Sequence, residues 1–432
     1  MAQEASDMAF SPEPAHAAPI FEGDFTAQEP LPREAAARAT ALLATGRLHR
    51  YTADPARGEI SEAARLEAEF AALAGRRHAL AVASGGYALA TALRAAGAGP
   101  GTRVLTGSFT LAPVPGAILA AGATPVLVEI DDNLAIDLED LAAKARESGA
   151  TCLLLSHMRG HVPDIDAIVS LCETMGLTLI EDCAHATGAL WRGRPAGRHG
   201  LFAAHSTQSY KHLNSGEGGL LVADDDDAMA RAILLSGSYM FFDRHGAAPP
   251  AAHIRRHVAA TPNISGRMDE LRAAVLRPQL PLLAGRVARW NGLHDIIATA
   301  LAALPAVALP KPPEGAVRVG SSLQFRLPGW PSAAVAALVE RARRRGVVLK
   351  WFGAPRPHGY TSRHDMWRHV PRIPLPRTDE ILRTLLDMRI SLLFTPDDAR
   401  RIARILVEEI DALDGEIRRR QGHLRRQRLT KG

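Results

Sequence analysis

The sequence lacks any run of about 18 or more apolar residues, so no segment of its 432 residues is expected to cross a membrane. The first twenty residues lack the basic start and apolar core of a secretory signal, and they carry acids and prolines instead. We therefore expect residues 1–25 to form a disordered leader. Only three cysteines occur, and Cys152, Cys172 and Cys183 match no disulfide or zinc spacing, which favours a cytoplasmic protein.

Acidic residues are absent from residues 418–432, which hold six arginines and one lysine. The net charge of +5 therefore conceals a slightly acidic body with a basic tail. Such a tail can contact nucleic acid or a membrane surface. The simpler interpretation is a solvated, frayed terminus, and we expect neither nucleic acid nor membrane as a partner.

The central part of the chain alternates short apolar runs with amphipathic helical stretches, and it contains no internal repeat. Helices are expected at 87–96, 138–148 and 165–175, between several of the runs. This alternation predicts an α/β fold with a mostly parallel sheet covered on both faces, whose ligands bind beyond the carboxyl ends of the strands. The expected strands are His78–Ala83, Arg103–Thr106, Pro125–Ile130, Cys152–Leu155, Leu177–Ile180, Phe202–His205 and Gly219–Ala223.

A large domain over residues 26–290, with an N-terminal helix, is expected to contain this sheet. Residues 237–263 look like a long surface loop, and a helix then runs from 267 to about 303 with an interruption at Pro278 and Pro281. A smaller C-terminal α+β domain is expected over residues 291–417. Its elements are strands at 322–327 and 347–351 and helices at 333–345, 378–386 and 395–413.

The first candidate site is Ala83-Ser84-Gly85-Gly86, which follows a strand and opens a helix. Glycines allow backbone N–H groups to approach an anion, and the amino end of the helix adds its positive dipole. The sequence therefore has the form of a phosphate cradle at Gly85 and Gly86. A strand-to-helix turn that needs glycine only for steric reasons has the same appearance.

The second candidate is Asp182, at the end of the apolar run that precedes Cys183 and His185. A buried carboxylate is costly without a cationic partner. The protonated nitrogen of a pyridine ring is one such partner, and the pairing keeps the ring electron-poor. An acid that caps the following turn is the structural alternative.

The third candidate is Lys211, which lies between a predicted strand and the glycine-rich turn Gly216-Glu217-Gly218-Gly219. A lysine there can form an imine with an aldehyde cofactor and later act as a base. Ser206, earlier in the same loop, can donate a hydrogen bond to a phosphate. A lysine in a loop is often only a solvated charge. Here, however, the cradle, the acid and the lysine occur in that order along the chain, each directly after a strand, and this combination favours a cofactor site.

With these motifs the chain resembles the DegT/DnrJ/EryC1/StrS family of sugar aminotransferases, which are fold-type I pyridoxal-phosphate enzymes. The resemblance extends from about Gly46 to about Leu413. Its strongest stretches are Gly99-Pro100-Gly101, Ser108-Phe109-Thr110, Ala121-Gly122-Ala123-Thr124-Pro125-Val126, Glu181-Asp182-Cys183-Ala184-His185, Lys211 with Gly216-Glu217-Gly218-Gly219, and Arg267-Met268-Asp269-Glu270-Leu271.

The resemblance implies a role for each matching residue. Lys211 forms the aldimine with pyridoxal 5'-phosphate and moves the proton, and Asp182 pairs with the pyridinium nitrogen. His185 lies near the ring hydroxyl, and Phe109 stacks on the ring. Further implied contacts with the cofactor or substrate come from Ser206, Gly85, Gly86 and Gln208. The resemblance also implies a homodimer with a composite active site, in which residues near Asn263 and Arg267 reach the partner's cofactor.

Three positions depart from the family pattern. Gly86 stands where the family usually has threonine, Ser265 where asparagine is common, and Leu201 where aspartate is common. The first removes a hydroxyl contact to phosphate, and the second places the cross-subunit phosphate contact in question. Some relatives carry histidine at the lysine position and catalyse dehydration, whereas this chain keeps Lys211.

Other residues near the predicted pocket carry weaker hypotheses. His157 and His161 have the spacing of zinc ligands on a helix, but they follow a strand, so we expect no metal site. Arg159 either binds a substrate carboxylate or forms a surface salt bridge. Lys350 lies either at the substrate mouth or in a segment of simple core packing. Tyr239 belongs to an apolar stretch that is either a dimer contact or a lid.

The sequence therefore predicts an aminotransferase that moves an amino group from an amino-acid donor, glutamate or glutamine by family analogy, to a keto or aldehyde sugar or a related polyhydroxylated carbonyl. Elimination, decarboxylation or racemisation would use the same cofactor residues and stays open. A non-catalytic regulator that binds the cofactor is a further alternative.

Overall fold

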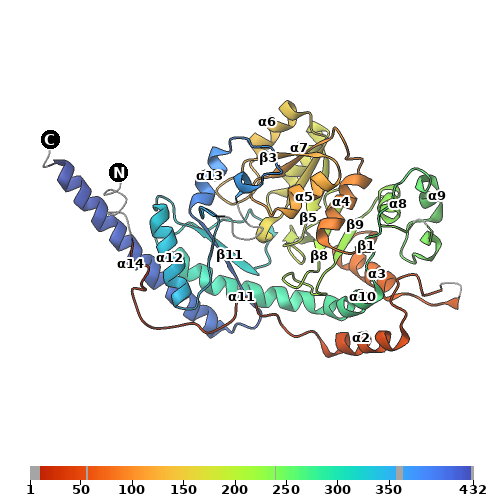
Figure 1. The fold of residues 1–432 in the computed structure, drawn as a ribbon, viewed down its shortest axis with the longest axis horizontal. Helices are drawn as coiled ribbons and strands as arrows, with labels where there is room; N and C mark the ends of the chain where they lie inside the picture. Colours follow the sequence, from red (N-terminus) through yellow and green to blue (C-terminus); the bar gives the residue numbers. More distant parts are fainter. Residues whose placement is uncertain (1–9, 55–56, 239, 357–362, 430–432) are drawn as a thin grey trace.

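A seven-stranded sheet forms the centre of the larger part of the protein (Figure 1). The computed structural model describes residues 10–54, 57–238, 240–356 and 363–429. Only β9 runs against the other strands, so the predicted mostly parallel sheet is confirmed. In spatial order the strands are β1 (His78–Val82), β9 (Gly219–Ala223), β8 (Phe202–Ser206), β5 (Thr178–Asp182), β4 (Cys152–Ser156), β2 (Arg103–Gly107) and β3 (Thr124–Val128).

Helices cover both faces of the sheet, because successive residues of each buried strand point to opposite sides. Leu154 and Ile180 pack with one helix layer, and Leu153 and Leu179 pack with the other. The first layer contains α4 (Gly85–Ala95), α5 (Pro113–Ala120) and α8 (Asp226–Leu235). The second contains α3 (Glu62–Ala74), α6 (Leu138–Ser148) and α7 (Ile165–Met175).

The connection after α8 is more ordered than the sequence predicts. Instead of one long loop it contains a short 3-10 helix, η3 (Phe242–Arg244), and helix α9 (Ala251–His257). Ile254 of α9 is buried against Ala230 and Leu234 of α8, and this packing stabilises a segment whose glycines and prolines suggest a loop. The predicted interruption at Pro278 and Pro281 is confirmed, since η4 (Arg277–Leu282) separates α10 (Glu270–Leu276) from α11 (Leu283–Ala302).

The C-terminal unit is built on a second, antiparallel sheet with the order β11 (Ser322–Arg326), β13 (Leu385–Arg389) and β12 (Lys350–Trp351). Strand β13 is a correction, because the sequence predicts one helix over 378–386. Helix α13 (Pro376–Arg383) ends before that point. After Thr384 the chain continues as β13, the central strand of this sheet. Helices α12 (Ser332–Arg344) and α14 (Pro396–Leu429) pack against each other beside this sheet.

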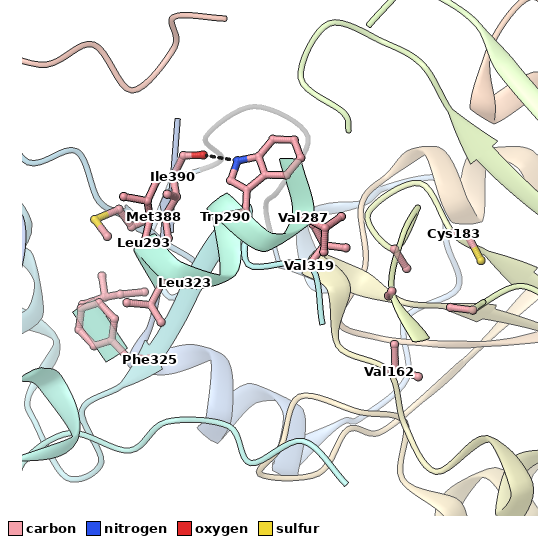
Figure 2. Close-up of a cluster of buried hydrophobic side chains, with 14 of the residues drawn as sticks. Val162, Cys183, Val287, Trp290, Leu293, Val319, Leu323, Phe325, Met388 and Ile390 are labelled. Carbon is pink, nitrogen blue, oxygen red and sulfur yellow. Dashed lines mark hydrogen bonds between the residues drawn. The ribbon is translucent and has the colours of Figure 1, made fainter. Parts of the chain in front are cut away.

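Helix α11 joins the two parts of the protein. Trp290 donates a hydrogen bond to the Ile390 carbonyl oxygen at 3.0 Å, and Met388 and Ile390 lie toward α11 (Figure 2). The predicted domain boundaries at residues 290 and 417 both fall inside helices, α11 and α14. Shorter elements complete the fold: α2 (Arg33–Thr45), the small sheet of β10 (Ala316–Val317), β6 (Leu190–Trp191) and β7 (Arg194–Pro195), and the 3-10 turns η2 (Met158–Gly160) and η6 (His364–Met366).

The described part of the predicted disordered leader, residues 10–25, is packed. Phe21 and Phe25 are buried and meet Phe394 edge-on, and the Phe21 amide donates to the Arg345 carbonyl oxygen at 2.9 Å. Burial of these two aromatic rings stabilises the segment, although its acids and prolines suggest disorder.

The predicted frayed tail is also a correction. Helix α14 continues to Leu429, and Arg420 on it lies 4.2 Å from the centre of the Phe10 ring. Phe10 and the last turns of α14 therefore lie side by side. No helix in the described ranges is long and apolar enough to cross a membrane.

Candidate active site

The predicted site residues meet in a cavity of about 600 Å³ at the carboxyl ends of the parallel strands. Parallel strands end at a common edge, so residues far apart in sequence are brought together there. Ser84 and Gly85 enter the cavity after β1, Asp182 at the end of β5, Ser206 at the end of β8, and Lys211 from the following loop. The cradle, the acid and the lysine therefore belong to one cavity.

The cradle is shaped by a close approach between Gly85 and β8. A Cβ atom added to Gly85 would lie 2.8 Å from Ser206 Cβ, so only glycine fits. Ser84 caps α4, because its Oγ accepts a hydrogen bond from the Tyr87 amide at 3.0 Å. The amino end of α4 and the Ser206 hydroxyl both line the cavity, which is the arrangement that binds a phosphate.

Gly86 differs from Gly85, because an added Cβ atom would meet nothing within 4 Å. A threonine side chain therefore fits sterically at this position, and the departure from the family pattern leaves accessible space in the cavity wall. Packing does not explain why this chain has glycine there.

Asp182 is buried and is held by neutral donors. The Ser156 hydroxyl donates to one carboxylate oxygen at 2.8 Å, and the Ala184 amide donates to the other at 3.0 Å. Thr110 in turn donates to Ser156 Oγ at 2.9 Å. No Lys, Arg or His within the described ranges forms a salt bridge with Asp182. A buried carboxylate so arranged fits a ligand that brings its own positive charge, as a pyridinium nitrogen does.

Lys211 and His185 also line the cavity. Lys211 Nζ lies 2.7 Å from His185 Nε2. Burial lowers the pKa of Lys211 to about 7; the charge of Asp182 acts to raise it, and the charges of Arg159 and Arg389 lower it further. Burial and then the positive charge of Lys211 hold the pKa of His185 well below its usual value. A neutral imidazole can thus accept a hydrogen bond from Nζ, and near neutral pH a substantial fraction of the amine is unprotonated and nucleophilic.

Glu181 precedes Asp182 but points away from the cavity, because adjacent strand residues face opposite sides. Its carboxylate lies 2.9 Å from His157 Nε2 and accepts hydrogen bonds from three backbone amides, including that of Gly197. Burial acts to raise the pKa of Glu181, but the His157 contact and these amides outweigh it and lower the pKa to about 2. Glu181 therefore fixes the loop beside Asp182.

The two histidines considered as zinc ligands face different partners. His161 Nε2 lies 2.8 Å from the Gln324 side-chain oxygen, whereas His157 contacts Glu181. His157, Glu181 and Cys183 do lie within 4.8 Å of one another. Glu181 is already fully hydrogen-bonded, however, and burial raises the pKa of the Cys183 thiol well above its usual value, which disfavours the thiolate that a metal needs.

Phe109 and Gln208, which were predicted to contact the cofactor or substrate, differ in their surroundings. Phe109 is buried against Phe352, with the ring centres 5.1 Å apart, in a cluster between the two parts of the protein. Among the described residues the cavity wall here is formed by Thr110 and Leu111, and the stacking of Phe109 on the ring stays a prediction. Because the chain turns after β2, neighbouring side chains point in different directions. Gln208 does line the cavity, and its side-chain oxygen accepts from the Tyr210 amide at 2.9 Å.

The structure also shows where two of the weaker candidates, Arg159 and Lys350, lie. Arg159 lines the cavity with a left-handed φ of 57°, and its guanidinium donates to Asp387 of β13 at 2.6 Å. Lys350 pairs with Asp387 in register across β12 and β13, and it lines neither this cavity nor the smaller one beside it in the described part of the chain. Burial lowers the pKa of Lys350 to about 8. Tyr239 lies outside the described residues.

Arg389, Tyr210, Thr110 and Ser156 line the cavity and were not predicted. Arg389 belongs to the strand that the sequence pattern conceals, and Ser156 ends β4 without a motif of its own. Thr110 lies in a stretch that carries the family resemblance, but the sequence gives it no role. Tyr210 is the exception, since it adjoins Lys211 directly in sequence.

The crystal structure of 3-amino-5-hydroxybenzoic acid synthase matches with a TM-score of 0.77 and 26% identity, over 90% of this chain and 99% of that chain. In sequence the chain is 32% identical over 287 residues to 3-amino-5-hydroxybenzoate synthase of Amycolatopsis mediterranei, covering 65% of this chain and 71% of that protein. It is 34% identical over 263 residues to L-glutamine:scyllo-inosose aminotransferase of Streptomyces griseus, covering 60% of this chain and 61% of that protein.

The fold and these similarities define a pyridoxal-phosphate-dependent aminotransferase. A family model matches residues 57–407, and the chain therefore belongs to the DegT/DnrJ/EryC1/StrS aminotransferase family.

The lowered pKa of Lys211 gives a first prediction. In the cofactor-free protein, labelling of Lys211 by an amine-selective reagent should rise with pH to a plateau, with its midpoint near 7 instead of near 10.5. Asp182→Asn should move the midpoint to lower pH, because the carboxylate charge favours the protonated amine. Peptide mass spectrometry at a series of pH values measures both midpoints, and a wild-type midpoint near 10 would contradict the burial of the amine.

The two cradle glycines give a second prediction. Gly85→Ala should weaken binding of pyridoxal phosphate to the cofactor-free protein by about tenfold or more, because its Cβ collides with Ser206. Gly86→Ala is the matched control and should leave the affinity within about threefold. Gly86→Thr should then strengthen binding, because it adds a hydroxyl donor. Fluorescence titration measures the affinities; equal losses for both alanine variants would mean that the cradle is misplaced.

Proposed function

We propose that this protein transfers an amino group from an amino-acid donor, glutamine or glutamate, to the carbonyl carbon of a sugar-like, polyhydroxylated acceptor, with pyridoxal phosphate attached covalently to Lys211. One observation carries the proposal: a poorly protonated amine and a buried carboxylate without a cationic protein partner, within the described residues, line the same cavity. The names of the relatives support the substrate classes, since one uses L-glutamine and an inosose.

Pyridoxal phosphate, when bound, supplies an electron-poor ring that takes up the electron pair of a bond broken at the substrate carbon. Asp182 would hold the charged ring nitrogen, and its two neutral hydrogen bonds fix the orientation of the carboxylate. The α4 amino end, Gly85 and Ser206 would bind the phosphate. With the ring nitrogen and the phosphate held in this way, Lys211 would lie within reach of the reactive end of the cofactor.

Lys211 would have two tasks. Its unprotonated Nζ is the point of attachment, and the same atom would take a proton from the α-carbon of the donor and later deliver one to the carbonyl carbon of the acceptor. His185 accepts a hydrogen bond from Nζ at 2.7 Å and so orients the amine. Because the pKa of His185 lies well below its usual value, the imidazole stays uncharged and would not compete with the ring nitrogen of the cofactor for the Asp182 carboxylate.

The third prediction tests the role of Lys211. Lys211→Ala should lose the visible absorbance of the attached cofactor and reduce kcat by about a thousandfold or more, since both attachment and proton transfer are removed. Lys144→Ala is a suitable control, because Lys144 lies on α6 and pairs with Asp140. Activity is followed as keto acid formed from the donor, which separates transfer from decarboxylation and racemisation. The keto acid should form only when the acceptor is present and without release of ammonia, which separates transfer from elimination. A Lys211→Ala protein that retains colour and turnover would refute the proposal.

We propose further that two copies of the chain form the working enzyme and that each site is completed by residues near Asn263 and Arg267 of the other copy. The segment that carries them lies beside the cradle, since the Ala83 amide donates to the Gly266 carbonyl oxygen at 2.7 Å. Met240 and Ile264 nearby are 65% and 63% exposed, which is typical of apolar side chains covered in an assembly.

The fourth prediction concerns this assembly. Sedimentation should give twice the 46.2 kDa mass of one chain. Ile264→Asp should shift the equilibrium toward single chains by about tenfold or more, because it buries an unpaired charge. Val348→Asp is the matched control, since Val348 is 54% exposed on the C-terminal unit. A single-chain wild-type protein with full activity would contradict the composite site.

A further inference from the structure

A second, smaller cavity of about 50 Å³ adjoins the cofactor cavity, and Lys211 lines both. One part of its wall comes from the N-terminal segment, residues 10–31, and another comes from the loop of residues 207–218 that carries Lys211. The N-terminal segment precedes residues 57–407, which the family model matches. Its contribution to this small cavity is therefore a feature that membership of the family does not define.

Gln279 of η4 is completely buried and holds the Lys211 loop by its backbone. The side-chain oxygen of Gln279 accepts a hydrogen bond from the Asn214 amide at 3.0 Å, and its side-chain nitrogen donates to the Asn214 carbonyl oxygen at 2.7 Å. The nitrogen also donates to the Val275 carbonyl oxygen at 2.9 Å, and the oxygen also accepts from Arg286 at 3.2 Å. These bonds use the two donors and the two lone pairs of the side-chain amide, so its orientation is fixed.

Arg286 connects Gln279 to the N-terminal segment. Its Nε donates to the Glu29 carboxylate at 2.9 Å, while another nitrogen of the same buried guanidinium contacts Gln279. Arg289, also on α11, donates to the other oxygen of Glu29 at 2.6 Å. Burial acts to raise the pKa of Glu29, but the two arginines outweigh it and lower the pKa, so the carboxylate is charged near neutral pH. Loss of that charge would leave the buried guanidinium without this partner and favour a different position for it.

Asn214 follows Lys211 by only three residues, and the chain between them is held as well. His212 is buried, and its Nε2 lies 3.0 Å from Ser321 Oγ. A displacement of Asn214 would therefore also displace Lys211 Nζ, which lies 2.7 Å from His185 Nε2. A misplacement of about 1 Å can lower the rate of a reaction by about 100-fold.

We propose that Glu29, Arg286 and Gln279 act as one unit that positions Lys211 for the reaction, so that the N-terminal segment is part of the active site. All three are positioning residues, because they act on Lys211 through the backbone of Asn214. The inference rests on the proposed function, in which Lys211 is the reacting amine.

The fifth prediction is a double-mutant cycle in the holoenzyme. Gln279→Met removes the four hydrogen bonds with a side chain of similar length and should lower kcat by about tenfold or more. Glu29→Gln keeps the shape but removes the charge that holds Arg286, and it should lower kcat by about threefold or more. The double variant should lose no more than Gln279→Met alone, because both changes affect the same unit.

The matched control is Glu13→Gln, which should leave kcat unchanged. Glu13 belongs to the same N-terminal segment and pairs with Arg344 of the C-terminal unit, but it lines neither cavity in the described part of the chain. The control therefore separates the role of Glu29 from a general need for ion pairs that hold the segment.

A second readout needs neither cofactor nor turnover. In the cofactor-free protein, Gln279→Met should move the pH midpoint of Lys211 labelling upward from about 7, because a displaced amine is less buried and the substitution itself changes no charge. Glu13→Gln should not move this midpoint. Labelling is measured well below the melting temperature of each variant, so that the midpoint reports the folded protein.

Losses of kcat that multiply in the double variant would overturn the inference, as would an unmoved labelling midpoint in Gln279→Met. Should Gln279→Met not fold, a Glu29→Gln protein with the wild-type kcat would refute the unit on its own. If the wild-type protein transfers no amino group from any donor, the proposed function fails instead, and the labelling midpoint then decides alone whether Gln279 positions Lys211.

Discussion

The site depends on a carboxylate that the protein buries without supplying a cation for it in the described residues. Asp182 lies at the end of the central strand β5, where parallel pairing on both sides removes it from water. Hydrogen bonds from Ser156 and Ala184 orient the carboxylate but do not neutralise it. Beyond these hydrogen bonds and the electrostatic interaction with Lys211, the stabilisation of this charge depends on what occupies the cavity.

Two adjacent residues of β5 have different roles because they face opposite sides of the sheet. Glu181 is satisfied entirely by the protein, through His157 and the amides around Gly197, whereas Asp182 faces the cavity. The same alternation recurs in β13. There Met388 supports the core and Asp387 and Arg389 face the lysine. In both strands the period of two places apolar or internally hydrogen-bonded groups on one side and charged groups that face the cavities on the other.

Much of this arrangement could be predicted from sequence, because glycines, acid and lysine that each follow an apolar run must converge at one sheet edge. What could not be predicted depends on contacts across the chain. The packing of the Phe109 side chain against Phe352 is one example. Strand β13 was hidden because residues 378–386 have a helical pattern that only the sheet pairing with β11 interrupts. The leader was judged by its acids and prolines, although Phe21 and Phe25 anchor it.

The packed N-terminal segment has a mechanical consequence. It is tied to the C-terminal unit through Phe21 and Arg345 and to α11 through Glu29 and Arg286, and between these attachments Ala27 and Gln28 form part of the wall of the small cavity. A rotation of the C-terminal unit would therefore also move Ala27 and Gln28. This part of the wall of the small cavity, which Lys211 also lines, is therefore attached to both parts of the protein.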